Sequence, residues 1–451
     1  MTTKVDRSGY LFSNKALVSL IIPLVIEQIL GVLVGMMSTV MVSGLGEAAV
    51  SGVSVVETIM FLLIGLFGAL ATGGAVIAGQ YLGLGDRKSA RESANQLVYL
   101  SVFIAIIAMI LTYVGHRFLL GHIFGAMDAE VMQHADRFLL IVAPVIPFVA
   151  LYNVCAALFR SQGNSKIPML VTLLMNVLNI GGNAILVFGF GMGTEGVAIA
   201  TLVARSLAAV VIAALLCNKK YEIYITFKRR FKPNWKMIRR VLKIGIPSGI
   251  ENSMFQVGKI VLLTMLAGFG TSAIAANAVG NIVFMIHVIP IFAIAMAMTP
   301  IVAQCIGAGA PEQAVYYMRK MMIISYSVIV VWSGVIWLLI PTILRIYNLS
   351  SETAAVTRQI IYIILILGIT VFPFSVIIPA VLRGAGDVKF VMYVTIGAMW
   401  ICRIGVSYLL AVHWEMGIFG IWLALTFDWV GRGIFFIYRY CRGKWKTIKS
   451  I

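Results

Sequence analysis

Eight ionisable side chains interrupt otherwise apolar stretches of this sequence, and they are the residues most able to do chemistry. They are the acids Glu27, Glu57, Glu251 and Asp428 and the bases Arg205, Lys259, Arg403 and Arg432. A charged side chain is costly at membrane depth, so such residues face a bundle interior or a wet cavity and commonly mark an ion or substrate pathway. Formally, the eight charges cancel.

Glu27 and Glu251 are the first candidates for cation coupling. Each follows a proline, Pro23 or Pro247, by four residues, which is about one helical turn. A proline permits a kink because it removes one backbone hydrogen bond. A carboxyl beside a bendable turn can be neutral when buried and charged when hydrated, as coupling to an ion requires. The alternative is that each carboxylate pairs with one of the intramembrane bases and only holds helices together.

Asp428 is the third candidate for cation coupling. Arg432 follows it by four residues, the spacing at which two side chains of one helix can form an ion pair. A purely structural pair is therefore an equally good interpretation. Glu57 lies about two turns from the outer end of its apolar stretch and could reach the membrane surface.

Polar side chains with helical spacing predict a substrate cavity. Asn176, Asn179 and Asn183 share one helix face, and Asn277 and Asn281 are one turn apart. Such amides either bond neighbouring helices or line a cavity. Arg205 and Arg403 are interpreted first as counter-charges to the intramembrane acids. The alternative is that they contact the substrate. The predicted cavity residues are Gln28, Ser38, Asn179, Asn183, Arg205, Gln256, Asn277 and Arg403.

The composition excludes a soluble protein. Of the 451 residues, 61% are hydrophobic and 12% are charged, whereas soluble domains carry about 25% charged residues; the mean hydropathy is +0.99. A net charge of +18 would suggest nucleic acid in a soluble protein, but the basic residues gather at the ends of apolar stretches, so we expect no nucleic-acid partner. The five cysteines lie in or beside those stretches, and we expect no disulfide.

Twelve apolar stretches are long enough to cross a hydrocarbon layer of about 30 Å. All should be helices, because a helix satisfies every backbone polar group in lipid, and the first has no cleavage site and is retained. They cover residues 16–42, 48–81, 96–114, 138–159, 167–188, 196–217, 241–269, 272–305, 321–344, 360–382, 390–412 and 417–437. We predict an N-lobe at 1–218, a basic linker at 219–240, a C-lobe at 241–440 and a basic tail at 441–451.

The basic residues predict the orientation. If the connections alternate between the two sides, 27 Lys and Arg fall on the side of both termini and four on the other. By the positive-inside rule, both termini are cytoplasmic, in a multi-pass protein of the cell (inner) membrane.

The sequence contains an internal repeat. At a spacing of 224, Ile22-Pro23 aligns with Ile246-Pro247 and Glu27 with Glu251, and at 223 Arg160 aligns with Arg383. Two copies of a six-helix unit start on the same face, as in transporters with parallel repeats that work by alternating access. A nucleotide-driven pump is excluded because the chain has no G-x-x-x-x-G-K-[ST] motif.

The stretches Ile246-Pro-Ser-Gly-Ile-Glu-Asn-Ser-Met-Phe-Gln and Ala275-Ala-Asn-Ala-Val-Gly resemble the multidrug and toxic compound extrusion (MATE) family of the MOP superfamily. So do the paired motifs that begin at Leu158 and Val381. The resemblance implies a V-shaped pair of six-helix bundles, not an enzyme, that exports organic, mostly cationic, compounds in exchange for protons or sodium ions. It implies no cofactor, small organic substrates in a lipid bilayer, and a monomer.

The sequence departs from this family at its usual coupling acids. Ser38 stands where many relatives have an Asp in the first helix, Asn183 falls on a second family carboxylate, and residues 359–382 contain no acid. The hypothesis left is that Glu27 and Glu251 share coupling, with protons favoured because a single carboxylate per lobe is enough.

Four other interpretations fit the sequence less well. A flippase for a lipid-linked oligosaccharide or peptidoglycan precursor would use a cationic cavity, whereas the intramembrane charges sum to zero. In the major facilitator fold the loop after the second helix usually contains a second glycine after an Asp-Arg pair, whereas residues 88–91 of this sequence, which follow Asp86-Arg87, contain no glycine. A passive channel does not explain why the chain has two lobes. A membrane enzyme such as an acyltransferase would need a nucleophile or metal constellation.

His116, His122 and His134 predict a solvated loop and no metal site, and His287 is interpreted as a packed polar residue.

Overall fold

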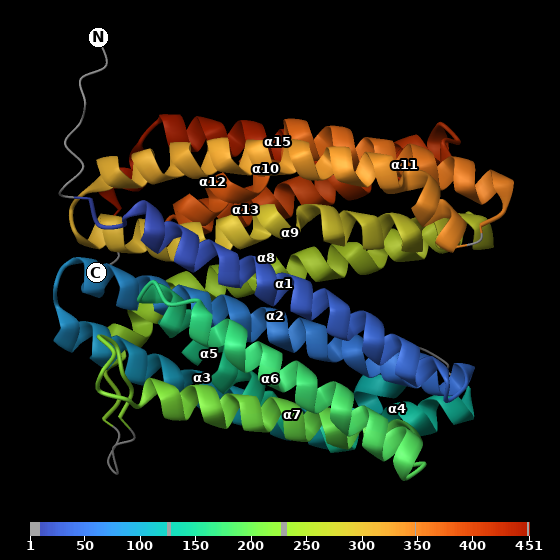
Figure 1. Cartoon of the computed structure of the whole chain (residues 1–451), viewed down its shortest axis with the longest axis horizontal. Helices are drawn as coiled ribbons and strands as arrows, with labels where there is room; N and C mark the ends of the chain where they lie inside the picture. The colour runs from blue at the N-terminus through green and yellow to red at the C-terminus, as the bar shows by residue number, and fades with distance from the viewer. Residues whose placement is uncertain (1–9, 124–127, 227–231, 348, 449–450) are drawn as a thin grey trace. The chain divides into compact units, whose positions relative to one another are not determined.

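The computed structural model describes residues 10–123, 128–226, 232–347, 349–448 and 451, and every regular element within them is a helix (Figure 1). The first half contains α1 (Asn14–Ser43), α2 (Glu47–Gly83), α3 (Arg87–Phe118), α4 (Ala129–Val142), α5 (Val145–Ser161), α6 (Lys166–Asn183) and α7 (Gly193–Leu216). The second half contains α8 (Trp235–Ala267), α9 (Thr271–Gly307), α10 (Pro311–Ile346), α11 (Ser351–Thr370), α12 (Phe372–Gly384), α13 (Val388–Gly397), α14 (Val406–Tyr408) and α15 (Gly417–Cys441). Short segments extend them: the π-helical η1 (Leu119–Ile123), η2 (Ala184–Gly189), η3 (Ala398–Gly405) and η4 (Leu409–His413), and the 3-10 turn η5 (Lys444–Thr447).

The spans agree with an all-α, multi-pass membrane protein. Among the described residues, ten helices are long and apolar enough to cross a membrane, and α4 with α5 would make an eleventh although they are bent by 54°. α8 completes the predicted twelve: it is 33 residues long, but Glu251 and Lys259 interrupt its apolar sequence.

Two predicted spans are broken in the structure. The stretch 138–159 is divided between α4 and α5 at Ala143 and Pro144, and 360–382 is divided between α11 and α12 at Val371, next to Pro373. Both breaks have the same cause, since proline has no N–H to donate and its ring displaces the preceding turn. The sequence analysis placed no break in either stretch.

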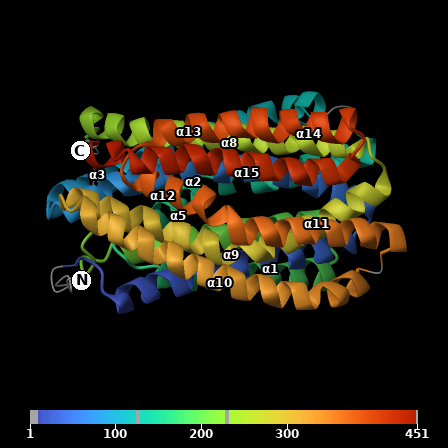
Figure 2. The same cartoon turned by 90° about the horizontal axis from the view of Figure 1, so that it is seen from above.

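The chain forms two compact units whose limits differ from the predicted lobes. One unit holds Ile26–Asn252, and the other holds Met1–Val25 with Ser253–Ser450. In the first, α2, α3, α5, α6 and α7 pack on one another. In the second, α9 packs on α10, α11 and α12, and Figure 2 shows α9 and α10 side by side.

α1 and α8 contribute to both units, which is why the limits differ. Leu17, Leu20 and Leu24 belong to the hydrophobic core around α9 and α10, whereas Val42 belongs to the core of the other unit. The division falls within two residues of Glu27 in α1 and of Glu251 in α8. The predicted linker at 219–240 separates the two sequence repeats. The two compact units instead divide within α1 and within α8, about one turn after Pro23 and Pro247.

Close backbone contacts explain why the first half of α8 belongs with α2. A Cβ atom on Gly73 would lie 2.7 Å from the backbone nitrogen of Gly245, and one on Gly245 would lie 2.8 Å from Leu70. A Cβ on Gly249 would lie 3.0 Å from Leu66. Small residues let two membrane helices approach in this way, and the dispersion contacts then stabilise the pair.

Candidate functional site

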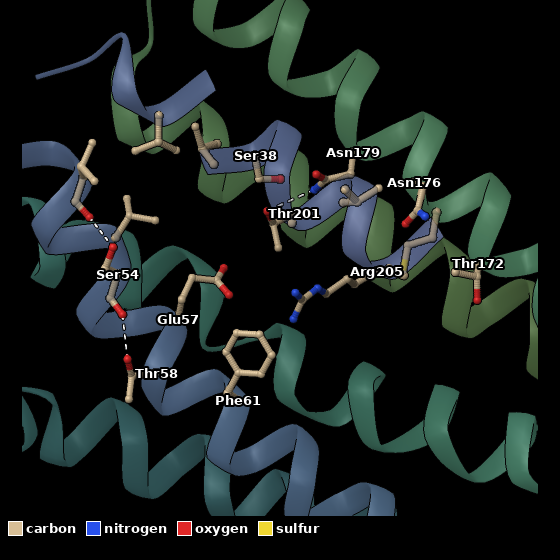
Figure 3. Close-up of a pocket in the computed structure, with 18 residues that line it drawn as sticks. Ser38, Ser54, Glu57, Thr58, Phe61, Thr172, Asn176, Asn179, Thr201 and Arg205 are labelled. Carbon is tan, nitrogen blue, oxygen red and sulfur yellow. Dashed lines mark hydrogen bonds between the residues drawn. The ribbon is translucent and has the colours of Figure 1, made fainter. Parts of the chain in front are cut away.

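A cavity of about 570 Å³ lies within the Ile26–Asn252 unit (Figure 3). Four helices supply its walls: α1, α2, α6 and α7. Nine of the eighteen lining residues are apolar or glycine, and the other nine carry polar side chains. The lining residues are Gly31, Val34, Gly35, Ser38, Val42, Val50, Val53, Ser54, Glu57, Thr58, Phe61, Thr172, Met175, Asn176, Asn179, Val197, Thr201 and Arg205.

Two opposite charges face each other across this cavity. Glu57 from α2 and Arg205 from α7 point toward each other into the open space, with the ring of Phe61 beside them (Figure 3). Both side chains are half-buried, and no ion pair between them occurs among the described residues. A ligand in the cavity can therefore meet a carboxylate on one wall, a guanidinium on the other and an aromatic ring between them.

The asparagine stripe of α6 both lines the cavity and bonds its neighbours. The Asn176 amide donates to the carbonyl of Leu30 at 3.2 Å, and the Asn179 amide donates to the Thr201 hydroxyl at 3.2 Å. Asn183 was predicted to line the cavity, but it is fully buried and donates to Asn179 at 3.2 Å. One helical turn carries it past the cavity to the start of η2, so its contribution is to orient Asn179.

Glu27 is paired with a base that the sequence reasoning overlooked. Its Oε1 accepts a hydrogen bond from Nη2 of Arg160 at 2.5 Å, and the two side chains are 10% and 17% exposed. Arg160 was assigned to a cytoplasmic connection because it lies one residue beyond the predicted span 138–159. In the structure it belongs to the last turn of α5, and its length lets the guanidinium reach back along the apolar surface.

Glu251 is buried, with 5% of its surface exposed, and it lies in the same unit as Glu27. The expectation of one coupling carboxylate in each lobe does not match this grouping, because the first half of α8 packs on α2. Gln28 is half-buried, and neither it nor Glu27 is among the residues that line the cavity.

Asp428 lies in the other unit and is held by two bases. Its Oδ1 accepts from Nε of Arg432 at 2.7 Å, its Oδ2 accepts from Nη2 of Arg432, and Nη1 of Arg403 is 3.8 Å from Oδ2. Asp428 is fully buried. The i, i+4 pair considered from the sequence is thus present, and its role in coupling stays a prediction.

The remaining predicted cavity residues also lie in the unit that contains α9 to α15. Gln256 and Asn277 are half-buried, and the Asn277 carbonyl accepts a hydrogen bond from Asn281 at 2.9 Å. Since they belong to the second unit, Gln256, Asn277 and Arg403 do not line the cavity described above.

The histidines make short polar contacts. Nδ1 of His116 lies 2.5 Å from Asp136, a carboxylate that the sequence reasoning did not connect with it, and Nδ1 of His134 lies 3.1 Å from the Thr194 hydroxyl. The side chain of His122 lies outside the described residues. Across the part of the chain that is described, no three His, Cys, Asp or Glu residues are placed to hold a metal ion.

The buried His287 supports its interpretation as a packed polar residue. It is fully buried, and its Nε2 is 2.8 Å from the Ser333 hydroxyl.

The internal repeat recurs in the turns and in the family comparison. Gly46 and Gly270 have φ values of 101° and 87°, and Gly85 and Gly309 have 82° and 68°, both pairs at a spacing of 224. A family model described as MatE matches the chain twice, at residues 23–185 and 247–409, again 224 apart (247 − 23 = 409 − 185 = 224). The chain belongs to the MatE family.

Relatives and solved structures agree along the whole length of this MatE protein. A "Probable multidrug resistance protein NorM" of Thermotoga maritima is 27% identical over 96% of this chain and 93% of its own. An "Uncharacterized transporter YisQ" of Bacillus subtilis is 30% identical over 95% and 94%. A crystal structure of MATE in complex with MaL6 is 21% identical and covers 95% of this chain and 96% of that one, with a TM-score of 0.87.

The fold of this MatE protein is therefore that of a MATE transporter, and the family is one of transporters and not of enzymes. Ser38, which replaces the family's first-helix Asp, lines the cavity wall that α1 supplies. The sequence reasoning missed Arg160, which a longer estimate of the fourth span would have included. It named Glu57 among the intramembrane charges but not among the predicted cavity residues.

Proposed function

We propose that this MatE protein is a secondary active antiporter that exports organic, mainly cationic, compounds in exchange for protons or sodium ions by alternating access. The cavity of about 570 Å³ with its opposed Glu57 and Arg205 is the observation that carries the proposal. Ligand pockets commonly occupy about 300–1,000 Å³ and combine an apolar wall with a few polar groups. The Thermotoga maritima relative is named a probable multidrug resistance protein, which supports the substrate class.

Binding is proposed to follow from the wall chemistry. The apolar side chains and Phe61 remove a flat organic cation from water, and a cation over an aromatic face is attracted by the ring. Glu57 supplies the opposite charge. Arg205 repels cations that do not reach Glu57 and can donate hydrogen bonds to a polar or anionic substituent. The apolar half of the wall makes no directional hydrogen bonds and therefore suits compounds of different shape.

Coupling is proposed to use Glu27 and Glu251, both buried in the unit that holds the cavity. Each lies in a helix that contributes residues to both units, close to a proline, so a change in that helix can alter the hydration of its carboxyl. In one state Glu27 is charged and paired with Arg160; in the other it takes a proton and the pair opens. Protons are the favoured ion, sodium is the alternative, and no cofactor is needed.

The membrane setting is part of the same proposal. The excess of basic residues on one side supports cytoplasmic termini and a location in the cell membrane. The partners proposed are the bilayer and small organic substrates, with the protein acting as a monomer.

The test is movement of ethidium into or out of proteoliposomes given a proton gradient, a sodium gradient or neither. Proton-driven movement that is lost in Glu251→Gln, with the variant still folded, would support the proposed coupling. Movement driven only by sodium would overturn the assignment of protons. Export by Glu251→Gln at the unaltered rate would overturn its role.

Substrate binding is tested with a matched pair of variants on α2. Glu57→Gln should weaken ethidium binding about tenfold or more, the effect of removing a charged partner worth roughly 1.5–3 kcal/mol. Glu47→Gln removes the same charge at the exposed start of the same helix and should leave binding unchanged. Equal binding by the two variants would contradict the cavity as the cation site.

A further inference from the structure

Three basic side chains surround one aromatic ring in the unit that contains α9 to α15. Lys259 Nζ lies 5.2 Å from the centre of the Phe255 ring, Arg432 Cζ 5.6 Å and Arg403 Cζ 5.8 Å. They come from three different segments, α8, α15 and η3. The cluster formed by Phe255, Lys259, Arg403 and Arg432 is called the basic cluster below.

One carboxylate does not neutralise the basic cluster. Asp428 gives both oxygens to Arg432, and the 3.8 Å between Arg403 and Asp428 is too long for a hydrogen bond. Within the described residues, neither Lys259 nor Arg403 donates a hydrogen bond to any acceptor. Three positive charges and one negative charge leave a net charge of +2.

The eight intramembrane charges cancel in the sequence, but they are not spread evenly over the two units. Asp428, Lys259, Arg403 and Arg432 lie in one unit, whereas Glu27, Glu57, Glu251 and Arg205 lie in the other. Three of the four acids therefore lie in the unit that holds the cavity, and three of the four bases lie around Phe255.

The repeat places the basic cluster at the positions that correspond to the cavity wall. At the spacing of 224, which holds along α1 and α8, the corresponding pairs are Gly31 with Phe255 and Gly35 with Lys259. The first member of each pair lines the cavity. The second unit therefore has an aromatic ring and a base at the positions where the first has two glycines.

The backbone at Arg403 differs from its counterpart too. Arg403 lies in the π-helical η3, whereas the corresponding part of the first repeat lies in the regular helix α6. The repeat spacing is 223 at Arg160 and Arg383 and 224 beyond η3, at Gly193 and Gly417. A π-helical turn admits one extra residue, and such turns are frequent at functional sites.

We propose that the basic cluster is an anion-binding site that takes the carboxylate or phosphate group of an organic anion. Two uncompensated positive charges are costly at membrane depth unless an anion or water reaches them. Arg403 and Arg432 are 20% and 11% exposed, so a ligand can reach both. A guanidinium binds a carboxylate or phosphate through paired hydrogen bonds, and the Phe255 ring offers a surface for an apolar body.

This inference rests on the proposed transport function and adds a second substrate class to it. The cavity with Glu57 suits cations, and the basic cluster suits anions. The anionic group has two conceivable sources, a soluble organic anion or a lipid headgroup, and both present the same chemistry to the cluster.

The test measures binding of fluorescein, a dianion at about pH 8, by fluorescence anisotropy to the full-length protein in phosphatidylcholine nanodiscs. Lys259→Gln/Arg403→Gln should raise the Kd at least tenfold. This pair is chosen because Arg432 keeps its bonds to Asp428, and Arg403→Gln alone, expected to give an intermediate loss, covers a folding defect of the double variant. Arg358→Gln, an exposed Arg on α11 of the same unit, is the matched control and should bind as the unaltered protein does.

Two competitors separate the possible sources of the anion. Displacement of fluorescein by benzoate assigns the site to organic anions, and displacement only by short-chain phosphatidic acid assigns it to lipid headgroups. Absence of saturable binding, or equal Kd values in all variants, would overturn the inference. Ethidium export by the same preparations reports on the proposed function separately, so export without fluorescein binding would refute the anion site alone.

Discussion

The buried pair of Glu27 and Arg160 gives the sharpest test of what holds the cavity-containing unit together. The two groups are 10% and 17% exposed and 2.5 Å apart. Removing one partner of such a pair leaves a buried charge without compensation, which costs about 3–5 kcal/mol. Replacing both partners by neutral groups removes that penalty and is commonly close to neutral.

The perturbation is therefore a double-mutant cycle with Arg160→Gln, Glu27→Gln and the two combined. We expect each single variant to lower the free energy of unfolding by about 3–5 kcal/mol and the double variant to lower it by less than either. The assay is unfolding of the purified protein by SDS titrated into mixed micelles, followed by circular dichroism.

An exposed pair in the same unit is the matched control. Arg87 and Glu222 are 2.7 Å apart, but their side chains are 60% and 48% exposed. Because exposed pairs contribute about 0–1 kcal/mol, Arg87→Gln should change stability little. The reasoning is refuted if Arg160→Gln costs no more than Arg87→Gln, or if the double variant is less stable than both single variants.

The same variants separate structure from coupling. If Glu27 only locks helices, the stable double variant should also transport. If Glu27 carries a proton, the double variant should be stable and still fail to export ethidium against a proton gradient, because neither amide can take up or release the proton. Full proton-driven export by the double variant would contradict the coupling role of Glu27.

Two further predictions concern packing and charge. Arg432→Leu leaves the fully buried Asp428 with only the distant Arg403 and should lower the free energy of unfolding by about 3–5 kcal/mol; a loss no larger than that of Arg403→Gln in the same SDS titration would contradict this. Gly73→Val places a Cβ 2.7 Å from the Gly245 backbone and should cost about 1–3 kcal/mol, whereas Gly65→Ala, with nothing within 4 Å of the new Cβ, should not destabilise; equal stability of the two would contradict the glycine contact.

Most of the fold could be predicted from the sequence, because membrane spans are local features. An apolar stretch of sufficient length must form a helix to satisfy its backbone hydrogen bonds in lipid. The repeat at a spacing of 224 is found by comparing the sequence with itself. The helix breaks at Pro144 and Pro373 were also visible in the sequence. The prolines next to Glu27 and Glu251 show why proline alone was not decisive, since Pro23 and Pro247 lie inside continuous helices.

The candidate site could be predicted only in part, because its contacts join residues far apart in the chain. Asn179 and Arg205, predicted from their types, and Ser38, predicted from the family resemblance, do line the cavity. The partner of Glu27 is 133 residues away, and no local spacing points to it. The membership of Glu251 in the cavity-containing unit depends on glycine contacts between α2 and α8, which hydropathy does not report.

The two repeats show how one architecture can diverge in charge. A glycine at position 31 or 35 leaves space, whereas Phe255 and Lys259 at the corresponding positions fill it and bring a positive charge. These substitutions keep the helices in place, since α1 and α8 both run past their proline and their buried Glu. What differs between the two units is the charge of the ligand that each can bind. A cation can pair with Glu57 in the cavity, and an anion compensates the excess base around Phe255. A formal charge sum over the whole chain hides this division, because a buried charge interacts mainly with the charges beside it.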